Sequence, residues 1–292
     1  MKNISAHFEL LACNLIWACS FPLYNLVMPS HIKPLPLFTA TVIFTALMSL
    51  TSLLRSKRDN VERADMMTIV GAALLIAFLR KGLLLFGLSL TSSVDGSIIS
   101  SLAPVAVLVI SVIVGVERFS SRKAMGILLG LGGAIGVILS GNDDAHHSSG
   151  MVGNIMILGC AFISAIYMVW FKGLLQKYEP MTLLRWMFCV TAIATVPFGL
   201  DSLLNVDTSG FDLRIWLAVA YLVVMPTYLP NLLLTSALKR VAPTVSSIYF
   251  YVQPTVAVAI SIWLGLDTLQ LTTVIFAALI FTGVGLVIST QR

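Results

Sequence analysis

The chain has 292 residues, of which 58% are hydrophobic and 11% are charged, and its formal net charge is +5 at pH 7. A water-soluble protein of this length cannot bury so many apolar side chains, so the composition excludes a soluble fold and predicts an integral membrane protein. Because Lys and Arg accumulate in the cytoplasmic loops of membrane proteins, we attribute the basic charge to such loops and expect no nucleic-acid partner.

Apolar stretches follow one another along the chain with little sequence between them. A membrane-spanning helix needs about 20 predominantly apolar residues. The ten stretches of about this length are 8–28, 35–54, 66–89, 91–115, 122–140, 151–173, 181–203, 213–237, 242–264 and 270–290. The sequence therefore predicts an all-α membrane protein with ten transmembrane helices, the first of which is retained and not cleaved as a signal peptide.

The two halves of the sequence are related to each other. Residues 79–139 align without a gap with residues 229–289, at a constant offset of 150. We therefore expect a first five-helix repeat over residues 1–140, a polar linker over 141–150 and a second five-helix repeat over 151–292. Identical pairs include Leu79/Leu229, Ser97/Ser247, Ile98/Ile248, Pro104/Pro254, Ser111/Ser261, Gly115/Gly265 and Gly133/Gly283.

The distribution of charge predicts that the two repeats cross the membrane in opposite directions. Residues 117–123 carry three basic side chains, whereas the equivalent residues 267–273 carry none. With both termini in the cytoplasm, most of the 18 basic residues fall in cytoplasmic segments, as the positive-inside rule requires. The sequence thus predicts inverted-topology repeats, which are typical of secondary transporters because two related halves can move around a site between them.

The first span carries a polar and aromatic stripe. An Asn side chain in lipid needs a partner or water, so we expect the stripe to face the interior of the bundle. The residues that recur at helical spacing are Asn14, Trp17, Phe21 and Tyr24.

Prolines predict interruptions in two spans. Pro22 is expected to interrupt the first helix locally, and Pro226 and Pro230 the eighth. Interrupted helices in transporters free backbone groups that line a cavity, although helix packing also accounts for such prolines.

Arg80 and Lys81 lie within the third span, several residues from its nearer end. An ionisable side chain inside a membrane is costly and is by default a functional candidate. Adjacent helical residues point about 100° apart, so one of the two can face a cavity while the other pairs with Asp95 or reaches the interface. A basic group in a cavity favours substrates that carry a carboxylate or a phosphate.

Further polar and aromatic residues of the predicted spans are candidates to contact a bound solute. They can equally form hydrogen bonds between helices. Together with the residues above, the predicted substrate-binding set is Asn14, Trp17, Arg80, Lys81, Ser97, Ser101, Tyr167, Tyr228, Asn231, Ser247, Tyr251 and Gln253.

Other features of the sequence receive structural interpretations. We expect Glu117 and Asp267 to anchor loops at the ends of their helices, and the glycines of the fifth and tenth spans to form close-packing faces. The linker residues Asp143, Asp144, His146 and His147 can bind a metal, but a solvated linker accounts for them more simply. The sequence shows no nucleophile and base in catalytic arrangement, so we predict neither an enzyme nor a resident metal or cofactor.

Residues 17–22, with the sequence WACSFP, resemble the opening signature of the EamA family in the drug/metabolite transporter superfamily. The ordered residues Gly87, Ser97, Pro104, Glu117, Gly126 and Gly133 resemble the body of the EamA repeat, which recurs as Pro254, Asp267 and Gly283. The resemblance implies a ten-helix inner-membrane carrier with both termini in the cytoplasm and a central cavity between its halves. Members of that family typically export amino acids, other small metabolites or drugs.

These observations predict a secondary active transporter in the bacterial inner (plasma) membrane. We expect it to export small metabolites, such as amino acids or amphipathic organic solutes, by alternating access without ATP. Its expected partners are a small-molecule substrate and membrane lipid. The alternatives are a flippase for lipids or lipid-linked substrates, a non-transporting membrane subunit, and a membrane-embedded enzyme acting on lipid-linked substrates.

Overall fold

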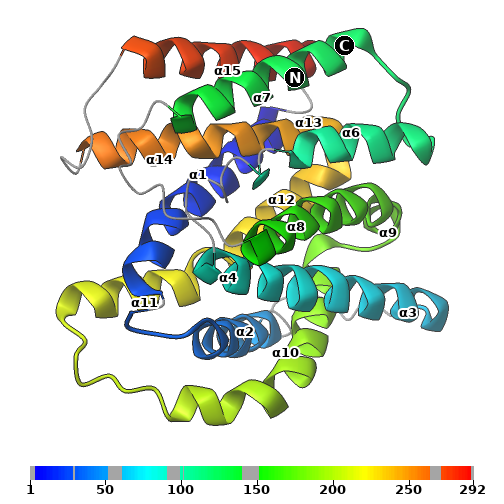
Figure 1. Cartoon of the computed structure of the whole chain (residues 1–292). Coiled ribbons are helices and arrows are strands. Elements are labelled where there is room, and N and C mark those ends of the chain that lie inside the picture. The colour runs from blue at the N-terminus through cyan, green and yellow to red at the C-terminus, as the bar shows by residue number, and fades with distance from the viewer. Residues whose placement is uncertain are drawn as a thin grey trace.

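The computed structural model describes residues 4–28, 30–51, 61–90, 99–100, 102–139, 151–263 and 271–290. Within these ranges every regular element is a helix and no strand occurs (Figure 1). The predicted all-α architecture is therefore confirmed for the described residues.

In the first half, residues 63–90 form one continuous helical rod whose middle third is a π-helix, labelled η2. A π-helix has a wider turn than an α-helix and is rare. The described elements of this half are α1 (Ile4–Val27), α2 (Pro34–Thr51), α3 (Arg63–Ala72), η2 (Ala73–Arg80), α4 (Lys81–Leu90), α6 (Ala103–Ile113) and α7 (Ser121–Leu139).

In the second half, several helix starts follow local sequence rules. Pro180 and Pro243 stand at the first position of their helices, where the missing N–H is not needed. Asp212 caps its helix by accepting a hydrogen bond from the Ile215 N–H at 2.8 Å. The elements are α8 (Met151–Trp170), α9 (Lys172–Lys177), α10 (Pro180–Leu204), α11 (Leu213–Val224), α12 (Tyr228–Arg240), α13 (Pro243–Ile248), η3 (Tyr249–Tyr251, a 3₁₀ helix), α14 (Val252–Trp263) and α15 (Leu271–Ser289).

Six described helical segments are long and apolar enough to cross a membrane. They correspond to the predicted spans one, two, three, six, seven and eight. Shorter apolar helices, Ala103–Ile113 and Val274–Ser289, lie within the predicted fourth and tenth spans. The six segments are Ile4–Tyr24, Pro34–Thr51, Arg63–Leu90, Met151–Lys177, Pro180–Leu204 and Leu213–Arg240.

The helices of the second half have the same spacing as those of the first. At the offset of 150 found in the sequence, α7 and α15 have equivalent first and last residues, and so do the segments 63–90 and 213–240. Their packing partners also correspond. α1 packs on α12 and α14, and α8 packs on α4 and α6.

The most extensive helix pair is α7 with α15, which lie side by side at the top of Figure 1. Their backbones touch at glycines. A Cβ atom on Gly126 would lie 2.8 Å from the Gly283 carbonyl oxygen, and one on Gly133 would lie 2.7 Å from the Phe276 carbonyl oxygen. These glycines form the close-packing face that the sequence predicts, whereas Gly132 and Gly285 face open space.

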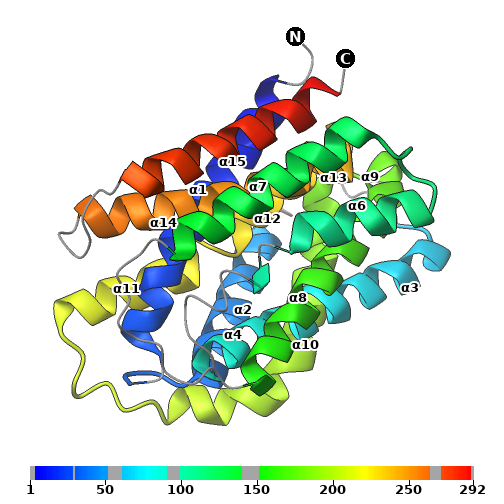
Figure 2. The same ribbon diagram turned by 45° about the horizontal axis from the view of Figure 1, so that its top comes forward.

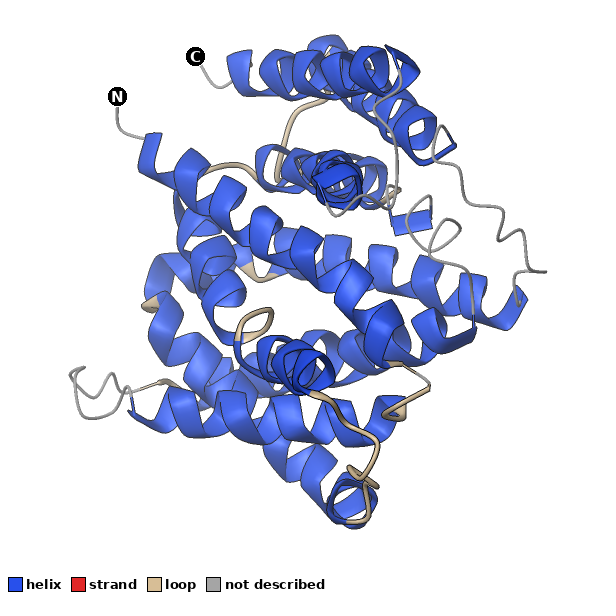
Figure 3. Ribbon diagram, turned by 90° about the vertical axis from the view of Figure 1, so that its left-hand side faces the viewer, coloured by secondary structure: helices blue, strands red, loops and turns tan. Residues whose placement is uncertain are grey.

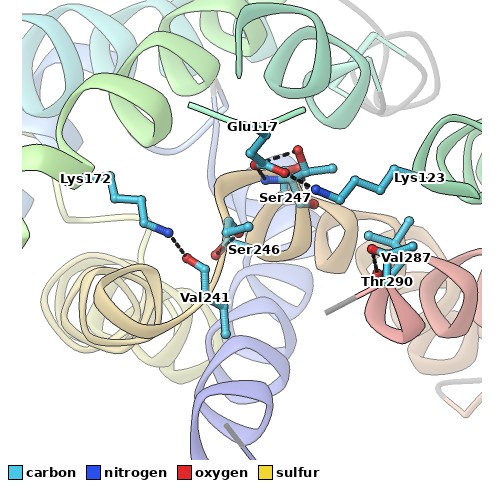
Figure 4. Close-up of polar contacts among 10 residues, drawn as sticks. Glu117, Lys123, Lys172, Val241, Ser246, Ser247, Val287 and Thr290 are labelled. Carbon is cyan, nitrogen blue, oxygen red and sulfur yellow. Dashed lines mark hydrogen bonds and ion pairs between the residues drawn. The ribbon is translucent and has the colours of Figure 1, made fainter. Parts of the chain in front are cut away.

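One end of the molecule gathers the basic segments. α1 begins and α15 ends at the same end of the molecule, as the marked termini show in Figures 2 and 3. At this end Glu117 accepts hydrogen bonds from the N–H (3.0 Å) and the hydroxyl (2.9 Å) of Thr244, and it forms an ion pair with Lys123 (Figure 4). Glu117 therefore joins the end of α6 to the start of α13, which confirms its predicted role as a loop anchor, whereas Asp267 lies outside the described residues.

The expectation that Pro22 interrupts the first helix is wrong. α1 runs as one α-helix from Ile4 to Val27 with Pro22 inside it. Transmembrane helices tolerate proline where neighbouring groups satisfy the freed backbone. Six residues before the proline, the Ile16 carbonyl accepts hydrogen bonds from the Ser20 hydroxyl at 3.0 Å and from the Tyr221 hydroxyl at 3.0 Å, and the second bond ties α1 to α11.

Candidate functional site

A cavity of about 150 Å³ lies in the middle of the bundle. Its walls come from both halves of the chain, from α1, α2, η2, α4 and α6 in the first and from α8, α10, α12, η3 and α14 in the second. Among the described residues, none that lines the cavity comes from α7, α11 or α15. The helices predicted as spans five and ten therefore pack outside the cavity.

Irregular backbone borders the cavity at equivalent places in the two halves. The π-helix η2 contributes Ile76, Ala77 and Arg80 to the cavity wall. In the second half the helix breaks between Val224 and Tyr228, at the positions equivalent to the middle of η2, and the turn contributes Pro226 and Thr227. The predicted interruption of the eighth span is thus confirmed. The irregularity in the third span has no proline to signal it.

Arg80 lines the cavity and is held against α8. Its Nε donates a hydrogen bond to the Ser164 hydroxyl at 2.5 Å, and that hydroxyl donates to the Cys160 carbonyl at 2.7 Å. The Cys160 thiol in turn donates to the Arg80 carbonyl at 3.3 Å. These contacts fix the guanidinium at the junction of the two halves.

Lys81 also lines the cavity. Its Nζ donates a hydrogen bond to the Tyr24 hydroxyl at 2.9 Å and lies 5.5 Å from the centroid of the same ring, within the range of a cation–π interaction. Asp95, the expected partner of one of the two cations, lies outside the described residues. Within the described part of the chain, the ion pairs join other residues and involve neither Arg80 nor Lys81.

Trp17 and Gln253 connect the first helix to the second half. The Trp17 Nε1 donates a hydrogen bond to the Pro226 carbonyl at 2.8 Å, and the Trp17 ring meets the edge of Phe250 with centroids 6.0 Å apart. The Gln253 Nε2 donates to the Asn14 Oδ1 at 2.7 Å, while Asn14 is fully buried and donates to the Leu10 carbonyl at 2.7 Å. Asn14 therefore orients Gln253, which lines the cavity.

The Trp17 indole satisfies a carbonyl that the helix break leaves without a helical partner. We predict that Trp17→Phe keeps most of the ring but lowers the stability of the purified protein by about 1–3 kcal/mol, the cost of an unsatisfied buried polar group. Thermal unfolding in detergent measures this change. Phe250→Leu is the control, because it removes an aromatic contact of Trp17 and keeps the hydrogen bond. An unchanged melting temperature of Trp17→Phe would contradict this role.

The other predicted residues divide into two groups. Asn231 lines the cavity and donates to the Thr227 carbonyl at 2.6 Å. Tyr228 is not among the lining residues, but it packs on Phe188, which is, with ring centroids 6.1 Å apart. Tyr167, Ser247 and Tyr251 are buried outside the cavity wall. Tyr167 stacks on Phe171, Ser247 donates to the Thr244 carbonyl at 2.9 Å, and Tyr251 packs against Gly130. Ser97 and Ser101 lie outside the described residues.

The cavity also contains residues that the sequence analysis did not select. Thr41 and Thr45 stand one turn apart on α2, and Cys160 and Ser164 stand one turn apart on α8. Two polar or small residues that stand four positions apart in an otherwise apolar helix are the signal that could have pointed to them. No group of three metal-ligating side chains occurs in the part of the chain that the structure describes.

Apolar helices of membrane-spanning length around a cavity indicate an integral membrane protein. The model of the EamA-like transporter family matches residues 4–139 and 151–289. The chain belongs to this family, and this indicates a transporter and not an enzyme.

Two relatives agree with this assignment, and a solved structure has a similar fold. An uncharacterized transporter of Archaeoglobus fulgidus is 26% identical over 260 residues, which cover 89% of this chain and 88% of the relative. The uncharacterized transporter YyaM of Bacillus subtilis is 21% identical over 97% of this chain and 93% of its own length. A crystal structure of a protein with 17% identity has a TM-score of 0.77 over 99% of this chain and 100% of that chain, a likeness of fold alone.

Proposed function

We propose that this protein is a secondary active transporter that exports small metabolites, such as amino acids or other amphipathic organic solutes, by alternating access. The observation that carries the proposal is the central cavity, lined by both halves of the chain, into which Arg80 and Lys81 bring positive charge. Ionisable side chains at such depth are retained where they serve a substrate or an ion pathway.

The proposed architecture is a pair of inverted five-helix repeats, residues 1–140 and 151–292, joined by a linker over 141–150. The equal spacing of the helices in the two halves and their corresponding packing partners support it. So does the placement of the two irregular segments that border the cavity. We further propose that the protein lies in a bacterial inner membrane with both termini in the cytoplasm, because the basic segments gather at the end that holds the termini.

Polar contacts between the halves at this basic end support an alternating-access mechanism. Asp65 forms an ion pair with Lys177 at 3.1 Å and accepts a hydrogen bond from the Tyr178 hydroxyl at 2.8 Å. Arg240 forms an ion pair with Glu9. At the opposite end, within the part of the chain that the structure describes, Asp201, Asp207 and Asp212 bond only to residues within four positions of themselves. We propose that the cross-half contacts close the cytoplasmic side and break when the transporter opens inward.

Removing both cross-half ion pairs should shift the protein toward the inward-open state. Each pair is partly exposed and individually weak, so the double variant Asp65→Asn/Arg240→Gln should raise the inward-open population only several-fold. A cysteine replacing Ile76 in the cavity, in a variant without the native cysteines, reports this population. Its labelling rate by a membrane-impermeant maleimide from the cytoplasmic side should rise by the same factor.

The matched control is Lys239→Gln. Lys239 pairs with Glu179 at 2.9 Å, and both residues belong to the second half. Breaking this pair should leave the labelling rate unchanged. Equal rates for the double variant and the control would refute the proposed cytoplasmic closure.

Flux measurements test the proposed function directly. The purified protein is reconstituted into liposomes, the liposomes are loaded with amino acids and organic acids, and solute efflux is followed with and without a pH gradient. Protein-dependent flux of any solute supports the proposal. Movement of fluorescent lipid without solute flux would identify a flippase instead, and the absence of both would favour a non-transporting subunit.

A further inference from the structure

The described lining of the cavity carries an unbalanced positive charge. Two cationic side chains, Arg80 and Lys81, stand among its described lining residues, and none of those lining residues is Asp, Glu or His. The remaining polar groups are hydroxyls, amides and backbone carbonyls, which carry no net charge. A pair of cations in a membrane interior, with no acidic partner among the described lining residues, is costly unless a ligand brings negative charge.

Both cations keep hydrogen-bond donors for such a ligand. In the described part of the chain, Arg80 uses its Nε on Ser164, and no residue bonds its two terminal amino groups. Lys81 uses one of its three donors on the Tyr24 hydroxyl. The guanidinium plane offers two parallel N–H groups that match a carboxylate, and Ser164 already holds that plane in place. The donors therefore suit one carboxylate bound between the two side chains.

The same cavity has an apolar wall. Trp17, Phe188 and Phe250 line it, with Leu184 and Met187 from α10. Trp17 is anchored through its Nε1 to Pro226, so its ring is available as a fixed surface. Such a wall suits an aromatic or branched apolar body attached to the carboxylate.

From these observations we infer that the transported solute is an organic monoanion, an apolar or aromatic carboxylate, and that the site disfavours zwitterionic amino acids and organic cations. The inference rests on the proposed transport function, and within its substrate class it selects the amphipathic organic acids over the amino acids. The ammonium group of an amino acid would enter a cavity that already holds two positive charges, and the repulsion between like charges is strong where water is excluded. The described lining residues offer that ammonium no carboxylate.

Three solutes with one ring and one chain length separate the charge classes. 3-Phenylpropionate is an anion at pH 7. Phenylalanine has the same skeleton with an added ammonium group and is a zwitterion. Phenethylamine is phenylalanine without its carboxylate and is a cation. Uptake of each into proteoliposomes and the rise in melting temperature of the purified protein are measured in parallel. We expect 3-phenylpropionate to exceed phenylalanine by about tenfold in uptake, equal to about 1.4 kcal/mol, and phenethylamine to show neither effect.

The Arg80→Gln variant links the selectivity to the charge. Its preference for 3-phenylpropionate over phenylalanine should fall from about tenfold to about equal. Lys81→Gln provides a second variant in case the first does not fold, and Arg63→Gln, an exposed residue at the start of α3, should keep the wild-type preference. A preference that survives in both cavity variants would overturn the inference.

The outcomes separate this inference from the function on which it rests. Uptake of phenylalanine or phenethylamine equal to or above that of 3-phenylpropionate would overturn the anion assignment and leave the transport function standing. Failure of all three solutes to move or to stabilise the protein would also overturn it. The broader solute screen described above would then decide separately whether the protein transports at all.

Discussion

Lys81→Ala should reduce transport strongly while the protein still inserts into the membrane and purifies normally. The ammonium group is one of two positive charges in the cavity, and a hydrogen bond from a charged donor contributes about 1.5–3 kcal/mol. Its loss corresponds to a drop of about 10- to 150-fold in transport. Insertion is not impaired because removing a charge from the membrane interior lowers the cost of insertion.

The measurement is initial uptake into proteoliposomes at matched protein content, with size-exclusion chromatography as the check on folding. Arg63→Ala is the matched control. It removes a basic side chain from the same helical rod, at an exposed position outside the cavity, and should transport like the wild type. Wild-type uptake by Lys81→Ala would exclude Lys81 from the substrate site.

The physics of burial in lipid explains why the sequence pointed to some of the cavity residues. Arg80 and Lys81 could be selected because a charge in the membrane interior is costly, so it is kept only where it has a function or a partner. Both line the cavity. Pro226 could be selected because proline lacks the N–H that a continuous helix needs, and the helix does break there.

Polar but uncharged residues could not be assigned in the same way. A hydroxyl in a helix can donate to a carbonyl one turn before it, so its presence in lipid requires no cavity. Ser247 forms such a bond and lies outside the cavity, whereas Thr41 forms one at 2.8 Å and lines it. The type of residue therefore does not show whether a hydroxyl lines the cavity. Only the packing of the helices separates the hydroxyls that line it from those that do not.

The backbone irregularity of the third span was also beyond prediction from sequence. Residues 73–80 are apolar apart from Arg80 and contain no proline or glycine, yet they form a π-helix. Their position is equivalent to the proline-containing break of the second half. A wider helical turn in one half and a turn in the other thus occupy corresponding places beside the cavity, which indicates that the tertiary arrangement imposes the irregularity.

Gly283→Ala should destabilise the protein strongly, whereas Gly285→Ala should not. A Cβ atom on Gly283 would collide with the backbone of α7, at the Gly126 carbonyl oxygen, and would lie 2.8 Å from the Gly130 nitrogen. Backbone atoms cannot move aside as a flexible side chain can, so α7 and α15 would have to separate. Overpacking of this kind costs about 1–3 kcal/mol, and small residues are what allow membrane helices to approach so closely.

Gly285 tests whether the effect depends on the interface and not on the substitution itself. It stands two residues further along α15 with no other atom within 4 Å of the added methyl group. Alanine there should be neutral or should stabilise the helix by up to about 1 kcal/mol. Melting temperatures of the two purified variants in detergent provide the comparison, and equal values would contradict the close contact between α7 and α15.

The same pair of variants separates folding from transport. In the described structure neither α7 nor α15 contributes a residue to the cavity wall. The fraction of Gly283→Ala protein that folds should therefore bind solute with the wild-type KM, and only the amount of active protein should fall. A changed KM with an unchanged melting temperature would mean that α15 acts on the cavity directly and that the α7–α15 pair takes part in transport.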